Sequence, residues 1–279
     1  MVLRGSLLRR STIRFRKRGC GMATKGKSAG VSRAARPPTI RHERPSLQNA
    51  ILLAMSRKER RIVLSRLEFV ELPARMILTE AGRPIEFCYF LNSGVASIIR
   101  VMSNGKSVEI GLIGKEGFIG LPLIVGLKTS PTRAIVQIGG SGYRMPARKL
   151  RAVLAECPGL AQLLHRYAHE LSIQAIYIAA CNRLHEVDRQ LARWLVMAHD
   201  RLEQPTVPLT QELISHTLGS RRASITEAAG VLQRNGLITY TRGQLTIKNR
   251  RGLEQASCEC YQGMNRQLKK WRRESQRGV

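Results

Sequence analysis

The sequence predicts an α+β fold: an N-terminal antiparallel β-roll of the jelly-roll-like kind, a long dimerisation helix and a C-terminal winged helix-turn-helix. Three observations support this fold. Residues 69–138 hold many short β-type runs separated by glycine-containing turns. After residue 158 the apolar side chains follow a heptad spacing, which is typical of a long helix with one apolar face. Residues 210–247 then show two helical stretches, a glycine turn between them and a hairpin pattern.

The first 45 residues are rich in Arg, Lys, Ser and Gly, contain one acidic residue and show no apolar periodicity. Such a segment buries too little apolar surface to offset its conformational entropy, so we expect a disordered basic leader over residues 1–45. An Arg-rich, acid-poor start also resembles a mitochondrial transit peptide. A simpler alternative is an over-extended start with translation from Met22. In either case the leader is not part of the predicted fold.

A sensor domain of the β-roll type is expected over residues 46–157, with short helical pieces between residues 48 and 67. Its clearest element is a hairpin between two β-type runs, because Asn104 and Gly105 form a strong two-residue turn signal. Many short strands with glycine turns favour a sandwich or barrel over a parallel sheet.

The predicted dimerisation helix spans residues 158–183, and one line of its side chains repeats at intervals of four and three residues. The members of this seam are Leu160, Leu164, Tyr167, Leu171, Gln174 and Ile178. The spacing also fits a helix that packs on its own domain. The length and regularity of the seam favour a helix that pairs, in addition, with a second copy of the chain.

The winged helix-turn-helix is expected over residues 184–262. Thr210 is a suitable N-cap for its first helix, which should end near Gly219. Ser220 is a suitable cap for the second helix, expected over residues 221–234. An Asn-Gly pair ends that helix, and two short β-type runs after it predict the wing.

Residues 48–262 resemble the Crp/Fnr superfamily of bacterial transcription regulators. In the sensor half the resemblance is carried by ILTEAGRPIEFCYFLNSGVASIIRVMSNGKSVEIGLIGKEGFIGLP, and in the effector half by LTQELISHTLGSRRASITEAAGVLQRNGLITYTRGQLTI. The second stretch is the more specific, because cap, turn glycine, helix pattern and wing follow the family's order. The resemblance implies a cyclic-nucleotide-binding-type β-roll, a dimer helix and DNA recognition by the second helix of the helix-turn-helix. It also implies a homodimer on a pseudo-palindromic site.

Basic and polar residues at the start of the second helix are the candidate DNA contacts. Arg222 falls where the catabolite-activator branch of the resembled family keeps a base-contacting arginine, and arginine suits guanine. Ala223 and Glu227 depart from that branch, so its target sequence cannot be assumed. The simpler interpretation of these arginines is solvated surface charge. The candidate set, with helix-start and wing-tip phosphate contacts included, is Thr210, Gln211, Ser220, Arg221, Arg222, Ser224, Thr226, Glu227 and Arg242.

The candidate effector pocket contains Gly120, Leu121, Arg133 and Ala134. In the resembled family, cyclic AMP is held by an acidic residue after a turn glycine and by an arginine followed by a small hydroxyl residue. Here leucine follows the glycine and alanine follows the arginine. Each charged hydrogen bond contributes ~1.5–3 kcal/mol, so we do not expect cyclic AMP to bind. An unknown small-molecule effector and a purely structural sensor domain both stay open.

The six cysteines show neither a disulfide framework nor a paired zinc signature. Cys258 and Cys260 are the only close pair and have no partner nearby in sequence, so ordinary reduced thiols are expected, with a redox role as the alternative. His165 and His169 lie four residues apart on one helix face but lack a third ligand, which favours a polar surface over metal binding. His185 is a haem-ligand candidate by residue type only. No metal and no cofactor are predicted.

The chain carries 47 Lys and Arg against 19 Asp and Glu, a formal charge of +28, which attracts polyanions. Double-stranded DNA is the expected partner, with RNA polymerase as a further candidate. A sequence-independent nucleic-acid-binding architectural protein is the alternative, because residues 263–279 form a predicted basic tail.

No apolar run approaches the ~18–20 residues of a membrane span, so a cytoplasmic protein without membrane contact is expected. The segment after residue 202 has room only for the winged helix, which argues against an enzyme.

Overall fold

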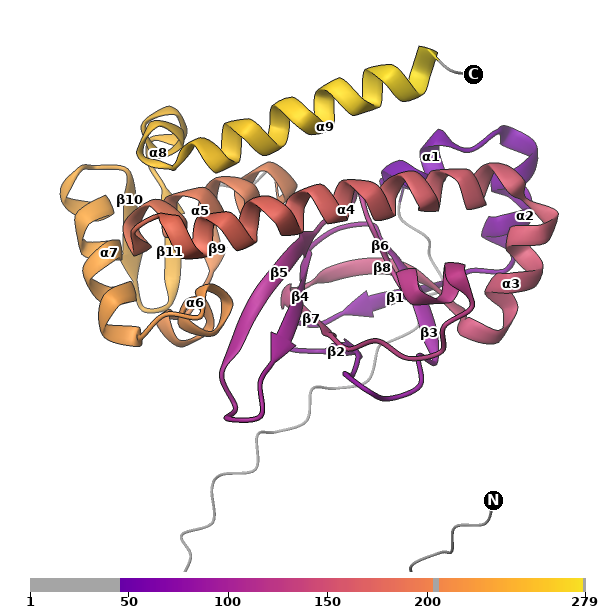
Figure 1. The fold of residues 1–279 in the computed structure, drawn as a ribbon, viewed down its shortest axis with the longest axis horizontal. Coiled ribbons are helices and arrows are strands. Elements are labelled where there is room, and N and C mark those ends of the chain that lie inside the picture. Colours follow the sequence, from indigo (N-terminus) through magenta and orange to yellow (C-terminus); the bar gives the residue numbers. More distant parts are fainter. Residues whose placement is uncertain (1–45, 203–205, 278–279) are drawn as a thin grey trace, which may run out of the picture. The chain divides into compact units, whose positions relative to one another are not determined.

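The computed structural model describes residues 46–202 and 206–277, so the predicted leader lies outside the described residues. The described chain has the α+β fold that the sequence predicts: two antiparallel sheets, one long helix and a C-terminal group of helices with a small sheet (Figure 1). Within this part of the chain, no helix combines the length and apolarity needed to cross a bilayer.

The N-terminal half is built from two four-stranded antiparallel sheets with the orders β1-β8-β3-β6 and β2-β7-β4-β5. Their strands are β1 (Glu68–Leu72), β2 (Ile77–Thr79), β3 (Phe87–Leu91), β4 (Val95–Val101), β5 (Ser107–Ile113), β6 (Phe118–Ile119), β7 (Arg133–Ile138) and β8 (Gly140–Pro146). Strands β6 and β8 fall in stretches where the sequence analysis expects no strand. Successive side chains of β1 alternate between two cores: Val70 faces the core between the sheets, and Phe69 faces the core under the helices.

The hairpin of β4 and β5 confirms the predicted Asn-Gly turn. The two strands pair in antiparallel register from Ala96 opposite Ile113 to Val101 opposite Ser107. Gly105 has a φ of 79°, a left-handed conformation that glycine adopts without steric cost.

Four helices and one 3₁₀ turn cover the outer face of the first sheet. They are α1 (Ala50–Ala54), α2 (Arg57–Ser65), η1 (Leu121–Val125), α3 (Ala147–Glu156) and α4 (Pro158–Leu184). The first two confirm the short helical pieces expected between residues 48 and 67, and each is capped by a side chain. The Asn49 side chain accepts a hydrogen bond from the Leu52 amide, and the Ser56 hydroxyl accepts one from the Glu59 amide.

The predicted dimer seam on α4 is directed toward this chain's own β-roll. Five of its members are buried and the sixth is partly buried: Leu160, Leu164, Tyr167, Gln174, Ile178 and, partly, Leu171. The Gln174 carboxamide accepts a hydrogen bond from the backbone N–H of Leu112 in β5 and donates one to the carbonyl of the same residue. The assignment of these six residues to a dimer seam is therefore wrong, because their surface is already used within one chain.

The opposite face of α4 is exposed, and it also follows a spacing of four and three residues. Ile176 is 65% exposed on this face. Exposed residues of the same face are His165, His169, Ser172, Ile176, Ala179 and Arg183. This face of α4 is left uncovered by the described residues.

The C-terminal half consists of helices around a three-stranded sheet of order β10-β11-β9. Its elements are α5 (Val187–Leu202), β9 (Thr206–Pro208), α6 (Gln211–Leu218), α7 (Arg222–Arg234), β10 (Ile238–Thr241), β11 (Gln244–Ile247), α8 (Arg250–Ala256) and α9 (Glu259–Arg277). The predicted wing hairpin is present as β10 and β11. Strand β9, which the sequence analysis missed, adds to its edge.

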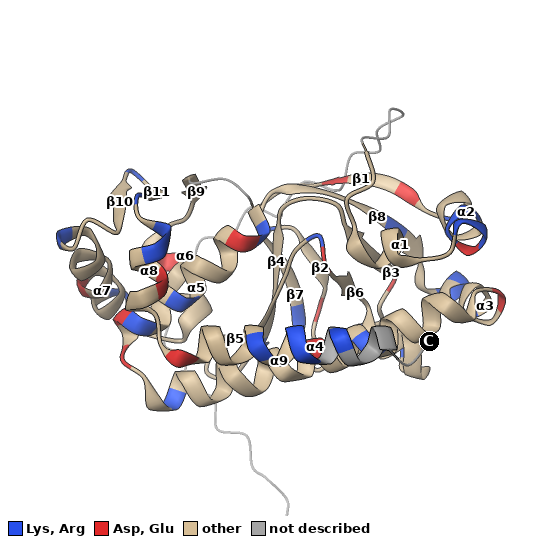
Figure 2. Cartoon of the chain, turned by 90° about the horizontal axis from the view of Figure 1, so that it is seen from above, with Lys and Arg blue, Asp and Glu red and all other residues tan. Residues whose placement is uncertain are grey.

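The predicted basic tail from residue 263 is not a separate tail, because α9 continues through it and packs beside α4 (Figures 1 and 2). Gly263 lies against Tyr177 of α4, and a Cβ atom at this position would meet the tyrosine ring at 2.8 Å. Met264, the next residue, is buried. Close approach of the two helices thus depends on a glycine at residue 263.

A buried carboxyl group joins the β-roll to the C-terminal half. The Trp194 indole N–H of α5 donates to the Glu109 carboxyl of β5 at 3.0 Å, and the Ser97 hydroxyl of β4 donates to the same carboxyl. Burial, opposed by these hydrogen bonds, raises the pKa of Glu109 to about 7. A second link is the ion pair between Arg201 of α5 and Glu116, at 2.8 Å.

We expect Glu109 to make the protein less stable as the pH rises from about 5 to 8. The folded state binds the Glu109 proton more tightly than the unfolded state does, so its stabilising contribution is complete at low pH and is lost as the pH passes about 7. Between pH 5.5 and pH 8 the loss should be on the order of 2 kcal/mol, and Glu109→Gln should remove it. Urea unfolding at pH 5.5 and pH 8 measures the change.

The matched control is Glu156→Gln, which removes an exposed carboxylate of α3. This variant should keep the pH dependence of the wild-type protein. Equal pH dependence in wild type and Glu109→Gln would contradict the assignment.

Candidate nucleic-acid interface

Helix α6 begins and ends as the sequence predicts. The Thr210 hydroxyl accepts a hydrogen bond from the Leu213 amide at 3.1 Å, which confirms the predicted N-cap. At the other end, Gly219 has a φ of 65° and its N–H donates to the Ser215 carbonyl. This left-handed residue reverses the chain direction between the two helices of the motif.

Helix α7 begins one residue later than expected, at Arg222, with Arg221 in the N-cap position. No side chain caps it, so the prediction that Ser220 caps this helix is wrong. The Ser220 N–H instead donates to the Ser215 carbonyl, as part of the turn that ends α6.

A polar contact and a shared core set the angle between α6 and α7. The Thr226 hydroxyl donates to the Gln211 side-chain oxygen at 3.0 Å, which brings together two of the predicted DNA contacts. Beneath them, Ile214 of α6 and Ile225 of α7 are buried in the same apolar core. The first turns of both helices are therefore held in one fixed relation.

The start of α7 presents a basic and polar face to solvent. Arg221, Arg222, Thr226 and Glu227 are exposed, and Ser224 is half-buried. A helix whose N-terminal side chains are exposed and whose opposite side is buried can enter a major groove without rearranging its own core. Arginine in the first turn can donate two hydrogen bonds to guanine.

The wing ends in an exposed arginine. Arg242 and Gly243 have φ values of 48° and 77°, and they join strands that pair up to Thr241 opposite Gln244. Positive φ at both central residues is the hallmark of a type I′ turn. The Tyr240 hydroxyl donates to the Leu209 carbonyl at 2.8 Å and fixes the wing to the segment before α6.

Basic residues also recur along α9 (Figure 2), and several of them are exposed. They are Arg266, Lys269, Lys270 and Arg273. Their positive charge favours contact with a polyanion regardless of base sequence.

The predicted effector-pocket residues have partners within the chain. Arg133, where the resemblance implies a phosphate ligand, forms an ion pair with Glu80 at 2.9 Å. Although partial burial works against ionisation, the hydrogen bond and charge of Arg133 hold the pKa of Glu80 below its usual value. Ala134 is buried between the two sheets, while Leu121 packs against the core under the helices. Gly120 adopts a positive φ just before η1.

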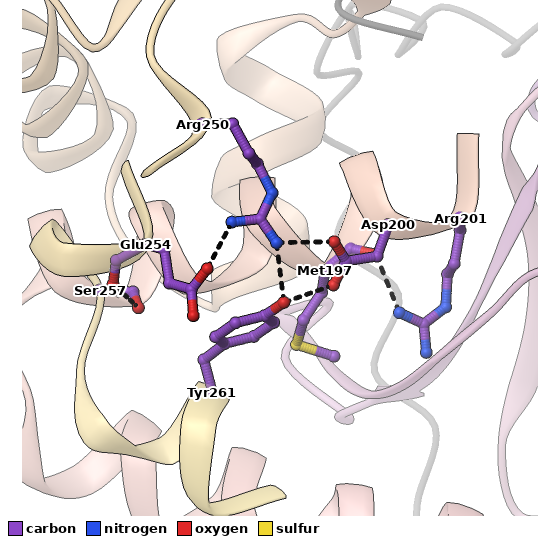
Figure 3. A network of polar contacts seen from close by, with 7 residues as sticks. All are labelled: Met197, Asp200, Arg201, Arg250, Glu254, Ser257 and Tyr261. Atoms are coloured by element: carbon purple, nitrogen blue, oxygen red, sulfur yellow. Dashed lines mark hydrogen bonds and ion pairs between the residues drawn. The ribbon is translucent and has the colours of Figure 1, made fainter. Parts of the chain in front are cut away.

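A polar network that the sequence analysis missed joins α5, α8 and α9 (Figure 3). The Arg250 guanidinium contacts Asp200 and Glu254 at 2.8 Å each and donates to the Tyr261 hydroxyl. The Tyr261 hydroxyl donates to Asp200 at 2.6 Å. Burial, together with that hydrogen bond, raises the pKa of Tyr261 to about 12, so the hydroxyl keeps its proton. The network fixes the start of α9 on the winged-helix half.

A second cluster unites residues that are far apart in sequence. Cys181 and His185, at the end of α4, meet Cys258 and Cys260, at the start of α9, with all four potential ligand atoms within 4.8 Å of one another. From the sequence alone, His185 is only a haem-ligand candidate by residue type, and the two C-terminal cysteines are expected to be ordinary thiols, with a redox role as the alternative. The spacing of 77 residues between Cys181 and Cys258 gives no sequence signal for this cluster.

Comparisons with known proteins match both halves of the chain. Residues 69–157 match the cyclic nucleotide-binding domain, and residues 189–256 match the Crp-like helix-turn-helix domain. The global nitrogen regulator of Synechocystis sp. is 22% identical over 183 residues, which are 62% of this chain and 81% of the relative.

Solved structures show the same fold. FixK2 from Bradyrhizobium japonicum aligns with a TM-score of 0.59 at 15% identity, over 69% of this chain and 98% of its own. A putative regulator of the Crp/Fnr family from Eubacterium rectale aligns with a TM-score of 0.58 at 15% identity, over 74% of this chain and 97% of its own.

A β-roll followed by a winged helix-turn-helix with an exposed basic recognition helix defines a DNA-binding transcription regulator. The chain belongs to the Crp/Fnr family of these regulators.

Replacing two glycines of the winged helix-turn-helix by alanine should change the free energy of unfolding in opposite directions. Gly219→Ala should lower the free energy of unfolding by ~1–2 kcal/mol, because an L-residue is strained at its φ of 65°. Gly230→Ala, inside α7, should raise it by ~0.5–1 kcal/mol, since its added Cβ meets only the flexible end of Arg234. Urea unfolding of the two full-length variants measures both, and a shift in the same direction would contradict the conformational argument.

Proposed function

We propose that this chain acts as a homodimer that binds a pseudo-palindromic site in double-stranded DNA, with α7 in the major groove. The observation that carries the proposal is the exposed, basic first turn of α7 on a buried helix pair, with Arg222 as the residue that contacts bases. The Thr210 cap at the start of α6 and Arg242 at the wing tip lie on the same domain and supply phosphate contacts. The chain then acts by binding, not by catalysis.

The dimer would form through the exposed face of α4, centred on Ile176. This face has the spacing of a two-helix seam, and the buried face cannot serve because it forms the core with the β-roll. A two-fold pair of winged helices would then contact half-sites about one helical turn apart.

The sensor domain would respond to a ligand other than cyclic AMP or serve as a structural module. The Arg133 guanidinium is already paired with Glu80, and Leu121 and Ala134 supply no polar side-chain group for a ribose or a phosphate. Bound upstream of a promoter, such a dimer can contact RNA polymerase, the further partner that the sequence analysis suggests.

A second candidate function is that of a sequence-independent nucleic-acid-binding architectural protein, which the basic side of α9 favours. Arg266, Lys269, Lys270 and Arg273 are exposed on this helix and would contact phosphates of any sequence. The two functions differ in which substitutions alter binding and in whether one sequence is preferred.

Arg222→Ala should remove the sequence preference at one position of each half-site. In selection from random duplex DNA at physiological salt, the wild-type chain should enrich one two-fold-symmetric motif. The variant should lose ~1–3 kcal/mol of discrimination at one position of each half-site. The control, Arg234→Ala, removes the same charge from the last turn of the same helix and should keep the motif.

Three outcomes separate the candidates. Loss of this preference in Arg222→Ala alone supports the regulator. Equal retention of the motif in both variants would remove Arg222 from its assigned role. Binding without any motif, reduced many-fold by Lys269→Ala with Lys270→Ala, would favour the architectural function instead.

Ile176→Glu should convert the dimer to a monomer, because it buries a charge at the centre of the proposed seam. Leu127→Glu, at another exposed apolar residue outside α4, is the control and should leave the dimer intact. Sedimentation equilibrium measures the change. A wild-type chain that is monomeric at micromolar concentration, or an Ile176→Glu variant that remains dimeric, would contradict the proposed seam.

A further inference from the structure

We propose that Cys181, His185, Cys258 and Cys260 bind a single zinc ion. Three cysteines and one histidine are a common ligand set of structural zinc sites. Two of the groups lie at the end of α4 and two at the start of α9, yet all four ligand atoms lie within 4.8 Å of one another. This site is separate from the DNA-binding face and from the effector-pocket residues.

Two of the distances within the cluster are close to those around one tetrahedral ion. Zinc–sulfur bonds of about 2.3 Å and zinc–nitrogen bonds of about 2.0–2.1 Å place tetrahedral ligand atoms about 3.5–3.8 Å apart. The Cys181 and Cys258 sulfurs are 3.4 Å apart, and the Cys260 sulfur is 3.7 Å from Nδ1 of His185. The sulfur–sulfur distance is far longer than the ~2.05 Å of a disulfide. Iron–sulfur clusters spread their ligands over several irons, which requires wider separations than these.

The surroundings of His185 orient it as a metal ligand does. Its Nδ1 is directed at the cluster, and its Nε2 contacts the Glu259 carboxylate at 3.1 Å. A carboxylate that accepts the second ring N–H fixes the tautomer and leaves the other nitrogen free to coordinate a metal.

Arg193 supplies an independent reason to expect negative charge in the cluster. This arginine is 2% exposed, and its hydrogen bonds go to the sulfurs of Cys181, at 3.2 Å, and Met197. A buried guanidinium is costly unless a negative group compensates it. The nearby Glu109 carboxyl is hydrogen-bonded to Trp194 and Ser97. A zinc ion with three thiolates and one imidazole carries a net charge of −1, and its Cys181 sulfur would accept the Arg193 hydrogen bond.

The site would be structural, because four protein ligands leave no open position for a substrate. His185 lies between α4 and α5, and Cys258 lies between α8 and α9. An ion held there would join the segment that leads into the winged-helix half to the segment that leads out of it.

Metal analysis of the purified full-length chain, kept reduced, tests the proposal. We expect one zinc per chain by mass spectrometry, and several-fold less in Cys258→Ser and His185→Ala. The control is Cys157→Ala, a buried cysteine at the opposite end of α4, which should keep the zinc. Glu259→Gln should weaken zinc affinity by about 10-fold in competition with a chromophoric chelator, as expected for a group that orients a ligand.

Cobalt keeps the test decisive if the variants fold poorly. Cobalt added to the chelator-treated wild-type chain should give the visible absorption of a tetrahedral site and a thiolate charge-transfer band. Zinc should displace it at one equivalent. Absence of both bound zinc and the cobalt spectrum in the reduced, folded chain would overturn the proposal. Iron with inorganic sulfide in place of zinc, or zinc retained by Cys258→Ser, would overturn it too.

Discussion

The rest of the structure depends on the packing of one face of α4 against the β-roll. The helix completes the core under the sheet through Leu160, Leu164 and Tyr167, and it bonds to β5 through Gln174. Because this face is fixed, the orientation of every other face of the helix is fixed as well. Helix α9 packs along one flank of α4, and the face of α4 that points away from the β-roll stays exposed.

The winged-helix half is attached to this frame by an apolar core and by polar groups. Val95, Leu112 and Ile138 of the β-roll lie in the same core as α5. Glu109 and Glu116 of the β-roll half contact Trp194 and Arg201 of α5. Buried polar contacts are directional, so they specify one docking arrangement where apolar contacts alone would allow several. This attachment is also sensitive to protonation, because the Glu109 carboxyl, with a pKa of about 7, changes its charge near neutral pH.

Local signals predicted local structure well in this chain. The heptad spacing after residue 158 predicted a long helix, and Thr210 and Gly219 marked both ends of α6. Periodicity states that a helix has an apolar face but not which molecule covers it, so the seam was assigned to the wrong partner. Strand β8 was missed because glycines interrupt its alternation.

Residues that act together across the chain could not be found from spacing. The ion pair of Arg133 with Glu80 joins positions 53 residues apart, and Cys258 meets a helix end 77 residues earlier. The two C-terminal cysteines are also closer together than the usual two to four intervening residues of a zinc motif. Only the fold places these groups side by side.

Helix α9 has a consequence for which chains can assemble with one another. The residues that match the Crp-like helix-turn-helix domain end at 256, so α9 lies beyond the matched region. It packs at Tyr177, next to Ile176 on the exposed face of α4. A chain that approaches this face therefore meets two helices, not one. In the dimer proposed above, α9 would border the seam and so help to decide which chains fit against it.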